Sequence, residues 1–303
     1  MSSELPDGCG HGHVLIAIAT YKRPDLLESL LDSVEAQAVA LGAHILVVDN
    51  DIDRSAQAVC GSRSGVVQYV PEPKPGIAAA RNRALRECDR YEYVCFVDDD
   101  ERAASGWLAR LLTCVIDYDA DVVSGPVLAR FPEGVPGWIV DGGFFECPRR
   151  PTGAEVLLPA TNNALVRVSA IKRLDSPWFD ERFSMTGGSD NEFFWRMRSS
   201  GCTSVWCDEA EVSELVDRRR MNVRWICRRG MRHGNVLARL RLREVSRLRV
   251  AAEGIARMGY GFVRALVVWM QARRPTAREI STLLRGIGMV QTAFGFTIKE
   301  YRR

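Results

Sequence analysis

Four consecutive acidic residues, at positions 98–101, directly follow the apolar run YVCFV at 93–97. Side chains at positions i and i+2 of an extended segment point to the same face, so Asp98 and Asp100 should converge while Asp99 points elsewhere. Two carboxylates held together repel each other, and a hard cation such as Mg²⁺ or Mn²⁺ stabilises them, often while bridging to the phosphates of a nucleotide. A solvated acidic turn, or the start of a helix over 105–118, is the structural alternative.

The segments around this acidic run alternate between strand-like and helix-like patterns. Short apolar runs rich in β-branched residues are predicted to be strands, at 14–19, 44–49, 66–70 and 93–97. The stretches between them are helix-like, at 25–40, 54–60 and 77–88. This βαβ spacing predicts an α/β fold with a Rossmann-like, mostly parallel sheet and helices on both faces.

Polar residues follow three of the predicted strands. They are TYKRP at 20–24, DND at 49–51 and DDD at 98–100. Ligands of open parallel sheets bind beyond the carboxyl ends of the strands. We therefore expect these three polar segments to form one site at one edge of the sheet.

Six sequence motifs occur in order along roughly residues 14–240. They are IAIATYKRPDLLESLL (16–31), ILVVDND (45–51), PEPKPGIAAARNRAL (71–85), FVDDDE (96–101), TNNALVRVSAI (161–171) and FDERFSMTGGSDNEFFWRMRSSG (179–201). Each motif is weak alone, but the ordered set resembles the family 2 glycosyltransferases. Within that family the chain is most similar to bacterial succinoglycan-type enzymes that extend exopolysaccharide repeat units. The resemblance implies a GT-A fold and metal-dependent transfer from a nucleotide diphosphosugar with inversion.

The resemblance also implies a donor site. Thr20, Tyr21 and Arg23 match positions that cradle the nucleotide base and phosphate, and Asp49 matches an acid that accepts a base N–H. Such a contact usually goes with uracil, so a UDP-sugar is the expected donor. Arg81, near the start of a helix after Gly76, would add a fixed charge for the diphosphate or the base. Packing of Tyr21 and surface ion pairs of the two arginines are the alternatives.

The acidic motif takes the ribose and metal contacts in this resemblance. Asp98 is carried over as a ribose and nucleotide contact, Asp100 as the principal ligand of Mg²⁺ or Mn²⁺, and Asp99 as a neighbour of the donor sugar. The expected task of the cation is Lewis-acid neutralisation of charge on the departing diphosphate.

An inverting transfer needs a base that takes the proton of the acceptor hydroxyl. The family places it in a Glu-Asp pair after a glycine, and here Asp190 matches the base while Ser189 replaces the usual Glu. Glu192 is the fallback, and since two residues on a helix project about 200° apart, only one of the two acids should face the site. Asp190 could also cap the helix that begins there.

Residues on the acceptor side are assigned more weakly. A loop rich in Gly and Pro surrounds Trp138 and suggests a position over the site. The candidates on this side are Trp138, Asn162, Asn163 and Glu192. The aromatic run 193–195 has helical spacing, which favours the core for Trp195 over a sugar platform. The acceptor itself could be a lipid-linked glycan, a free saccharide or a small natural product.

The carboxyl-terminal part of the chain is basic and helix-like. Residues 218–249 hold twelve arginines and one acid, Glu244, or about +11 against about −8 for the remainder. We expect a catalytic domain over 1–217 and an amphipathic helical extension over 218–303. The stretch 251–271 is apolar but interrupted by charges, which argues against a membrane span. Peripheral membrane contact through 218–271, packing on the catalytic domain and a dimer contact all remain open.

Cysteine usage and the amino end bear on location. Nine cysteines is an odd count without a C-x-x-C pair, and the first residues lack a secretory pattern. We therefore expect reduced thiols and a cytoplasmic chain, with peripheral contact on the inner face of a membrane as an open alternative. Cys9, His11 and His13 are interpreted as part of a Gly-rich tail rather than a metal cluster.

Other protein classes fit the sequence less well. A dinucleotide-dependent oxidoreductase would carry G-x-G-x-x-G after the first strand, where TYKRP stands, and no G-x-x-x-x-G-K-[ST] loop occurs. A non-catalytic nucleotide-sugar-binding protein, or a basic protein that binds nucleic acid or membranes, is the remaining alternative. No nucleic-acid partner is expected.

Overall fold

The computed structural model describes residues 13–63, 65–183, 187–271 and 276–298. The chain divides into two compact units. The first contains the described residues up to Leu128, those from Cys147 to Phe183, and Ser189–Glu214. The second contains Ala129–Glu146, the glycines 187 and 188, and the described residues from Leu215 onward. The sequence-based division at 217/218 therefore leaves out residues 129–146, which group with the helical extension.

A seven-stranded sheet forms the centre of the first unit, with strand order β3-β2-β1-β4-β8-β6-β9. Its strands are β1 (Val14–Thr20), β2 (His44–Asp49), β3 (Val67–Pro71), β4 (Tyr93–Asp98), β6 (Val122–Ser124), β8 (Asn163–Arg167) and β9 (Ser204–Trp206). The first four run parallel, β8 is antiparallel to both of its neighbours, and β6 pairs with β9 in parallel. The predicted mostly parallel α/β sheet is confirmed.

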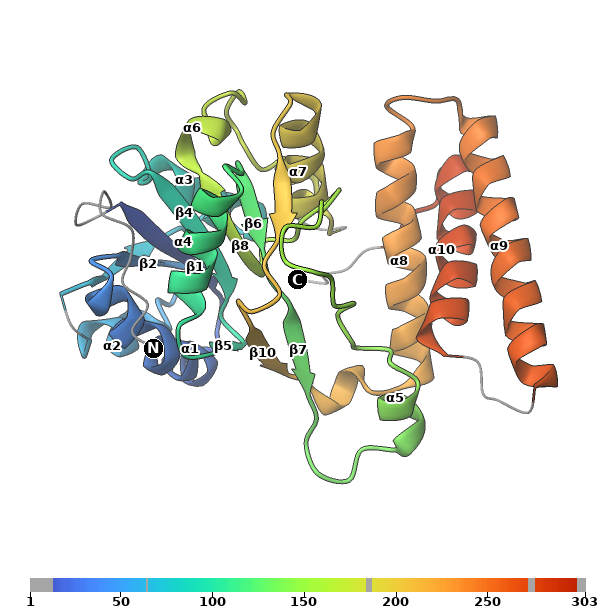
Figure 1. Ribbon diagram of the computed structural model, residues 1–303, viewed down its shortest axis with the longest axis horizontal. Helices are drawn as coiled ribbons and strands as arrows, with labels where there is room; N and C mark the ends of the chain where they lie inside the picture. The colour runs from blue at the N-terminus through green and yellow to red at the C-terminus, as the bar shows by residue number, and fades with distance from the viewer. Residues whose placement is uncertain (1–12, 64, 184–186, 272–275, 299–303) are drawn as a thin grey trace. The chain divides into compact units, whose positions relative to one another are not determined.

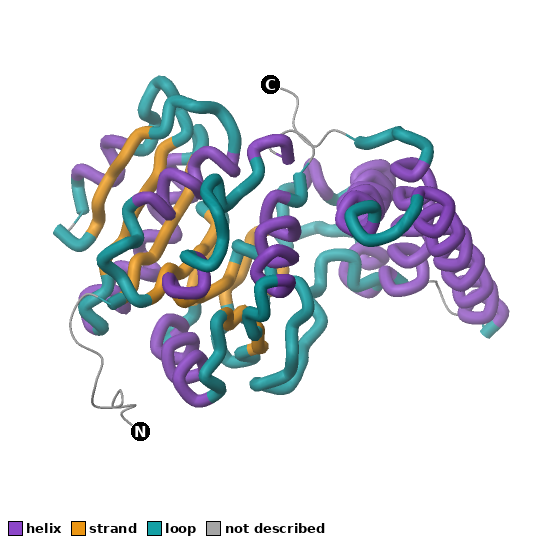
Figure 2. Tube along the Cα trace, turned by 90° about the horizontal axis from the view of Figure 1, so that it is seen from above, coloured by secondary structure: helices purple, strands orange, loops and turns teal. Residues whose placement is uncertain are grey.

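Helices cover both faces of this sheet (Figures 1 and 2). They are α1 (Pro24–Ala40), α2 (Gln57–Gly61), α3 (Ile77–Arg86), α4 (Trp107–Asp117), α6 (Val168–Ile171) and α7 (Ser189–Ser199). The residues of β1 alternate between two hydrophobic cores: Ile16 and Ile18 pack with α1 and α4, whereas Leu15 and Ala17 pack with α3 and α7. A strand buried on both faces is therefore apolar throughout, as the sequence pattern of 14–19 indicated.

A second, three-stranded sheet has the order β5-β10-β7. Its strands are β5 (Glu101–Ala103), β10 (Val212–Leu215) and β7 (Val127–Arg130). Strand β5 follows β4 after a two-residue turn, so the acidic run belongs partly to each sheet. The remaining short elements are α5 (Gly137–Asp141), η1 (Glu181–Phe183) and η2 (Arg218–Arg220).

Three long helices make up most of the second unit: α8 (Val223–Arg241), α9 (Arg247–Met270) and α10 (Ala277–Ala293). Helix α10 packs against both α8 and α9 (Figure 1). Glycines allow close backbone approach: a Cβ on Gly254 of α9 would lie 2.9 Å from the carbonyl of Gly286 in α10. The predicted helical extension is confirmed. No described helix is long and apolar enough to cross a membrane.

Candidate active site

The carboxyl ends of three parallel strands meet at one edge of the main sheet. The pairing register places Thr20 of β1 beside Asp49 of β2, and Asp98 of β4 beside Ala19. The three polar segments that follow these strands therefore lie together, as expected from the topology of open parallel sheets.

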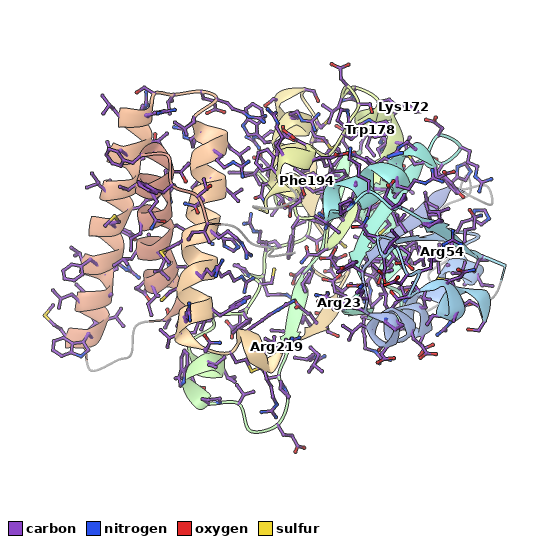
Figure 3. All side chains as sticks on the ribbon, turned by 180° about the vertical axis from the view of Figure 1, so that it is seen from behind. Arg23, Arg54, Lys172, Trp178, Phe194 and Arg219 are labelled. Atoms are coloured by element: carbon purple, nitrogen blue, oxygen red, sulfur yellow. The ribbon has the colours of Figure 1, made fainter. Side chains whose placement is uncertain are left out.

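The acidic run forms a turn, not an extended segment. Strand β4 ends at Asp98, and Asp99 and Asp100 occupy the turn that leads into β5. One guanidinium nitrogen of Arg23, Nη1, contacts a carboxylate oxygen of Asp99 at 3.2 Å and of Asp100 at 3.1 Å. Arg23 is labelled in Figure 3. The expectation that Asp99 points away from its neighbours is wrong, because the i, i+2 alternation holds only while the chain stays extended.

Asp99 is an internal support of this edge. Its carboxylate accepts a 2.8 Å hydrogen bond from the hydroxyl of Thr20, in addition to the contact with Arg23. Burial raises the pKa of Asp99 to about 6, against the lowering effects of Arg23 and Thr20. The family resemblance assigned Thr20 to the donor site, but in the structure its hydroxyl orients Asp99.

Asp98 connects the acidic turn to two other elements. Its carboxylate accepts a 3.2 Å hydrogen bond from Arg81 of α3, and its backbone N–H donates to the buried carboxyl of Glu101 at 3.0 Å. Burial raises the pKa of Asp98, although 39% of its side chain reaches solvent. The charge of Arg81 opposes this rise, whereas the negative charges of Asp100 and Asp190 add to it. The charge of Asp190, the candidate base, is thus one of those that act on Asp98.

Aromatic packing links Arg81 to the helix that carries Asp190. The guanidinium of Arg81 lies over the ring of Phe179 at 5.8 Å, and that ring stacks on Phe193 of α7 with centroids 4.4 Å apart. Asn82, next to Arg81, exchanges two 2.8 Å hydrogen bonds with the backbone N–H and C=O of Phe179. The donor-side arginine and the start of α7 are therefore held by one packed group.

The loop after β2 is organised by Asp49, which is fully buried. Its carboxylate accepts hydrogen bonds from the backbone N–H groups of Asp51 and Ala56, at 3.0 and 2.9 Å, and from the hydroxyl of Tyr69 at 3.2 Å. Burial and the charge of Asp49 raise the pKa of Tyr69 to about 12. The assigned contact of Asp49 with a nucleotide base therefore competes with three internal bonds.

Lys22 and Asp51 form an ion pair that the sequence analysis did not assign. The Nζ of Lys22 lies 3.6 Å from a carboxylate oxygen of the buried Asp51 and 5.5 Å from the ring centroid of Tyr21. Lys22 also has a left-handed backbone, with φ of 55°. Its place in TYKRP, beyond a strand end, was the available signal, and Asp51 stood in the quoted DND segment.

Asn50 fixes the loop that leads into α3. Its side chain donates to the carbonyls of Glu72 and Lys74, at 2.8 and 2.6 Å, and accepts from the N–H of Gly76 at 2.7 Å. Gly76 has φ of 124° and ψ of 144°, a conformation that side-chain-bearing residues rarely adopt. The start of α3, and with it Arg81, depends on these two residues.

The two acidic residues of α7, Asp190 and Glu192, differ in burial and in their partners. Asp190 is partly exposed in the first turn and accepts a 2.9 Å hydrogen bond from Asn191. Glu192 is buried and paired with Arg196 at 3.0 Å, and Arg196 also donates to the carbonyl of Trp178. Because Glu192 is buried and paired with Arg196, Asp190 remains the candidate base.

The aromatic run on α7 divides between core and surface. Phe193, Phe194 and Met197 are fully buried in the core shared with α3 (Figure 3 labels Phe194). Trp195, which we expected in the core, is only partly buried.

The acceptor-side candidates do not form one group. Asn163 is buried, donates to the carbonyls of Pro126 and Ala210 at 3.1 and 2.7 Å, and accepts from the indole of Trp107 at 2.8 Å. Its polar atoms are thus used inside the protein, so we do not carry it forward as an acceptor contact. Asn162 is partly exposed, and Trp138 of α5 packs edge-on against Phe144 at 5.9 Å in the second unit.

The acidic turn fits a divalent cation only if the phosphates of a bound nucleotide and water complete the coordination. Among the described residues, no group of three or more His, Cys, Asp or Glu side chains is arranged to hold a metal ion. Mg²⁺ in nucleotide sites is usually bound by one or two carboxylates plus substrate phosphates and waters. Asp98 and Asp100 would supply the carboxylates. His13 of the expected tail lies 3.3 Å from Glu92, while Cys9 and His11 lie outside the described residues.

This sheet, with an acidic turn after β4 and helices on both faces, defines a GT-A glycosyltransferase architecture. The family model for glycosyl transferase family 2 matches residues 15–175. The chain is 31% identical over 299 residues to the succinoglycan biosynthesis protein ExoM of Rhizobium meliloti strain 1021, covering 95% of this chain and 96% of that protein. The chain therefore belongs to glycosyl transferase family 2 and is a nucleotide-sugar-dependent glycosyltransferase.

Solved structures support the fold. A crystal structure of GalNAc-T7 with UDP, GalNAc and Mn²⁺ matches with a TM-score of 0.53 at 12% identity, over 68% of this chain and 44% of that chain. The structure of residues 1–349 of S. aureus TarS matches with a TM-score of 0.54 at 17% identity, over 93% of this chain and 90% of that chain. At these identities the likeness concerns the fold alone.

Proposed function

We propose that this glycosyltransferase moves a sugar from a UDP-sugar to an acceptor hydroxyl, with inversion at the anomeric carbon and with Mg²⁺ or Mn²⁺ bound at the acidic turn. The observation that carries the proposal is the set of contacts at the strand ends, where Arg81 pairs with Asp98 at 3.2 Å and Arg23 pairs with Asp100 at 3.1 Å. The ring of Phe179 links Arg81 to Phe193 of α7, the helix that carries the candidate base.

The chain's own residues can be assigned to the steps of such a transfer. Arg23 and Arg81 hold fixed positive charge at the strand ends, where it would bind the donor diphosphate. Asp190 would accept the proton of the acceptor hydroxyl as that oxygen attacks the sugar. A divalent cation on Asp100 and Asp98 would neutralise negative charge on the leaving diphosphate.

The identity of the donor and metal has support from a structural neighbour. GalNAc-T7 was crystallised with UDP, GalNAc and Mn²⁺, and its fold resembles that of this chain. The acidic turn offers oxygen ligands, which Mg²⁺ and Mn²⁺ prefer. We therefore favour a UDP-sugar with either cation.

The relative ExoM supports a saccharide acceptor. Its name places it in succinoglycan biosynthesis, and the similarity extends over nearly the whole of both chains. We infer that this chain extends a repeat unit of an exopolysaccharide, and that the acceptor is a growing glycan, free or lipid-linked. A small natural product is the alternative acceptor.

A panel of nucleotide sugars tests this function. The full-length protein is mixed with UDP-, GDP- and dTDP-sugars, with and without Mn²⁺, and thermal shift and release of free nucleotide are measured. We expect stabilisation and slow nucleotide release with one UDP-sugar, only when Mn²⁺ or Mg²⁺ is present. A preference for GDP- or dTDP-sugars, or equal activity in a chelator, would contradict the donor or metal assignment.

A further inference from the structure

Helix α9 exposes an apolar surface along its whole length. We call this surface the outer face of α9. Its large exposed side chains are Leu248, Ile255, Tyr260, Phe262, Val263, Leu266, Val267, Trp269 and Met270. Phe262 and Trp269 are 60% and 66% exposed. A patch of this extent on a described helix marks an interaction surface.

The outer face of α9 is too wide for a coiled-coil seam. At 100° per residue, Trp269 and Tyr260 at its two borders project about 180° apart. A coiled-coil partner covers a narrow stripe of two positions per heptad, whereas a helix in a bilayer interface buries a broad apolar arc. The buried side of α9, with Gly254 and Gly261, packs on α10.

The helices of the second unit carry strong positive charge. Together α8, α9 and α10 contain twelve arginines and two acidic residues, Glu253 and Glu279. Both acids are already paired, Glu253 with Arg241 at 2.8 Å and Glu279 with Arg264 at 3.4 Å. This excess of positive charge on the three helices attracts anionic lipid.

A hollow beside the outer face of α9 adds a place for a charged headgroup. It has a volume of about 490 Å³ and is lined by Glu253, Ala256, Arg257 and Tyr260 of α9 and by Thr282 of α10. Burial and then the charge of Arg257 lower the pKa of Arg285, whose side chain also reaches solvent. Arg257 therefore places positive charge at the hollow next to the apolar face, and Arg285 of α10 is a second exposed arginine of the same unit.

We propose that α9 docks on an anionic lipid bilayer, lying in the interface with its outer face among the acyl chains. Arg257 and Arg285 then contact the phosphate groups of the headgroups. An amphipathic helix of this kind enters only about 5–10 Å below the headgroups, so the contact is peripheral and requires no membrane span. The role is separate from sugar transfer, because it uses none of the residues of the acidic turn.

Vesicle sedimentation of the full-length protein tests the docking surface. We expect binding to vesicles that contain phosphatidylglycerol, little binding to pure phosphatidylcholine, and weaker binding at high salt. The double variant Phe262→Ser/Trp269→Ser should bind about tenfold more weakly or worse. The matched control is Val39→Ser/Leu157→Ser, because both residues are 56% exposed apolar side chains of the first unit. The control should bind like the parent.

The arginines are tested in the same assay. Arg257→Gln/Arg285→Gln should weaken binding severalfold and reduce its salt dependence, whereas Arg86→Gln, on α3 of the first unit, should change neither. Circular dichroism and nucleotide binding check that each variant is folded. Equal binding by the α9 variants and the controls would overturn the proposal.

Fluorescence quenching gives a direct readout that does not depend on a damaging variant. Lipids brominated along the acyl chain should quench part of the tryptophan emission of the parent protein, and Trp269→Phe should remove that part while binding is kept. No quenching, or quenching that persists in Trp269→Phe, overturns insertion of this face. A concentration-dependent dimer that Phe262→Ser/Trp269→Ser abolishes, without vesicle binding by the parent, would assign the face to a second copy instead.

Discussion

Asn82 and Phe179 lie 97 positions apart in the chain and exchange two hydrogen bonds, each of 2.8 Å. The side-chain amide of Asn82 therefore satisfies both backbone polar groups of Phe179, as the backbone of a neighbouring strand would. Because Phe179 also stacks on Phe193 and lies beneath Arg81, this one contact joins the two halves of the site.

Replacing Asn82 by Ala removes both bonds and leaves a buried N–H and C=O without their partner. We expect a loss of about 1–3 kcal/mol in the free energy of unfolding, together with slower transfer because Arg81 and Asp190 lose their common support. Urea unfolding and steady-state kinetics measure the two effects. Asn82→Asp keeps an acceptor for the N–H of Phe179 and should fall between Asn82→Ala and the parent; a fully stable and active Asn82→Ala would contradict the role.

Asp190→Asn removes the proposed base with little change in shape. Transfer should fall by roughly 100-fold or more, while the affinity for UDP stays near that of the parent. Isothermal titration and a transfer assay separate the two quantities. Asn191→Ala serves as the neighbouring control, since it removes only a 2.9 Å hydrogen bond to Asp190. Normal turnover by Asp190→Asn would exclude Asp190 as the base.

Asp100→Asn should weaken binding of UDP in the presence of Mn²⁺ by roughly tenfold or more, and change it little in a chelator. The comparison is needed because Asp100 also pairs with Arg23 at 3.1 Å. Arg23→Gln loses that pair but keeps the metal ligand, so its UDP affinity should remain sensitive to Mn²⁺. If Asp100→Asn behaves like Arg23→Gln, Asp100 is a partner of the arginine and not a metal ligand.

Gly76→Ala introduces a side chain where φ is 124°. The strain should cost about 1–3 kcal/mol of unfolding free energy, and displacement of α3 should raise the KM for the donor through Arg81. Gly61→Ala is the control, because a Cβ there meets nothing within 4 Å and α2 is helical. The control should be neutral or slightly stabilised. Equal stability of the two variants would show that the loop adapts freely.

Glu253→Gln tests the ion pair between α8 and α9 through its pH dependence. Hydrogen bonding from Arg241 lowers the pKa of Glu253 below its ordinary value of 4.5. A lowered folded-state pKa contributes stability above pH 4.5 that is lost as the pH falls through the lowered value. Both side chains are about one-third exposed, so we expect the variant to lose about 0.5–1 kcal/mol at pH 7 and progressively less as the pH falls below 4.5.

Unfolding followed by circular dichroism at pH 7, 5 and 3 measures this difference. Glu155→Gln, which breaks an exposed pair with Arg198 on the first unit, should change little at any of these pH values. A loss in Glu253→Gln that persists at pH 3 would show that packing, and not charge, explains the effect.

The sequence predicted the four parallel strands β1 to β4 of the main sheet, because their signals are local. The run 14–19 became β1 (Val14–Thr20) and the run 93–97 became β4 (Tyr93–Asp98), since buried parallel strands are apolar on both faces. Strands β6, β8 and β9 of the main sheet and all strands of the second sheet were missed. Strands β5, β7 and β10 are three or four residues long, which is too short for a period of two to be distinctive.

The sequence predicted which residues come together at the site, but it predicted the directions of their side chains less well. Asp98, Asp99, Asp100, Arg23 and Arg81 do come together, because the carboxyl ends of parallel strands share an edge. The direction of Asp99 could not be predicted, since the turn after Asp98 depends on pairing of β5 with the distant β10.

Long-range partners account for the other differences. The contact of Asn82 with Phe179 and the internal bonds of Asn163 join segments that carry no mutual signal in one sequence. In a single sequence, an asparagine that binds a ligand looks the same as one that holds two loops together by hydrogen bonds. Only the fold distinguishes them.

The two units cannot be separated by a single cut of the chain. Residues 129–146 belong to the second unit although the chain on both sides of them belongs to the first. Within the second unit, Ala277 donates to the carbonyl of Gly142 at 2.7 Å, and Phe145 stacks on Trp225 with centroids 5.5 Å apart. Gly188, two positions before Asp190, lies against Val236 of α8. A chain shortened before α8 would therefore leave residues 129–146 without these partners.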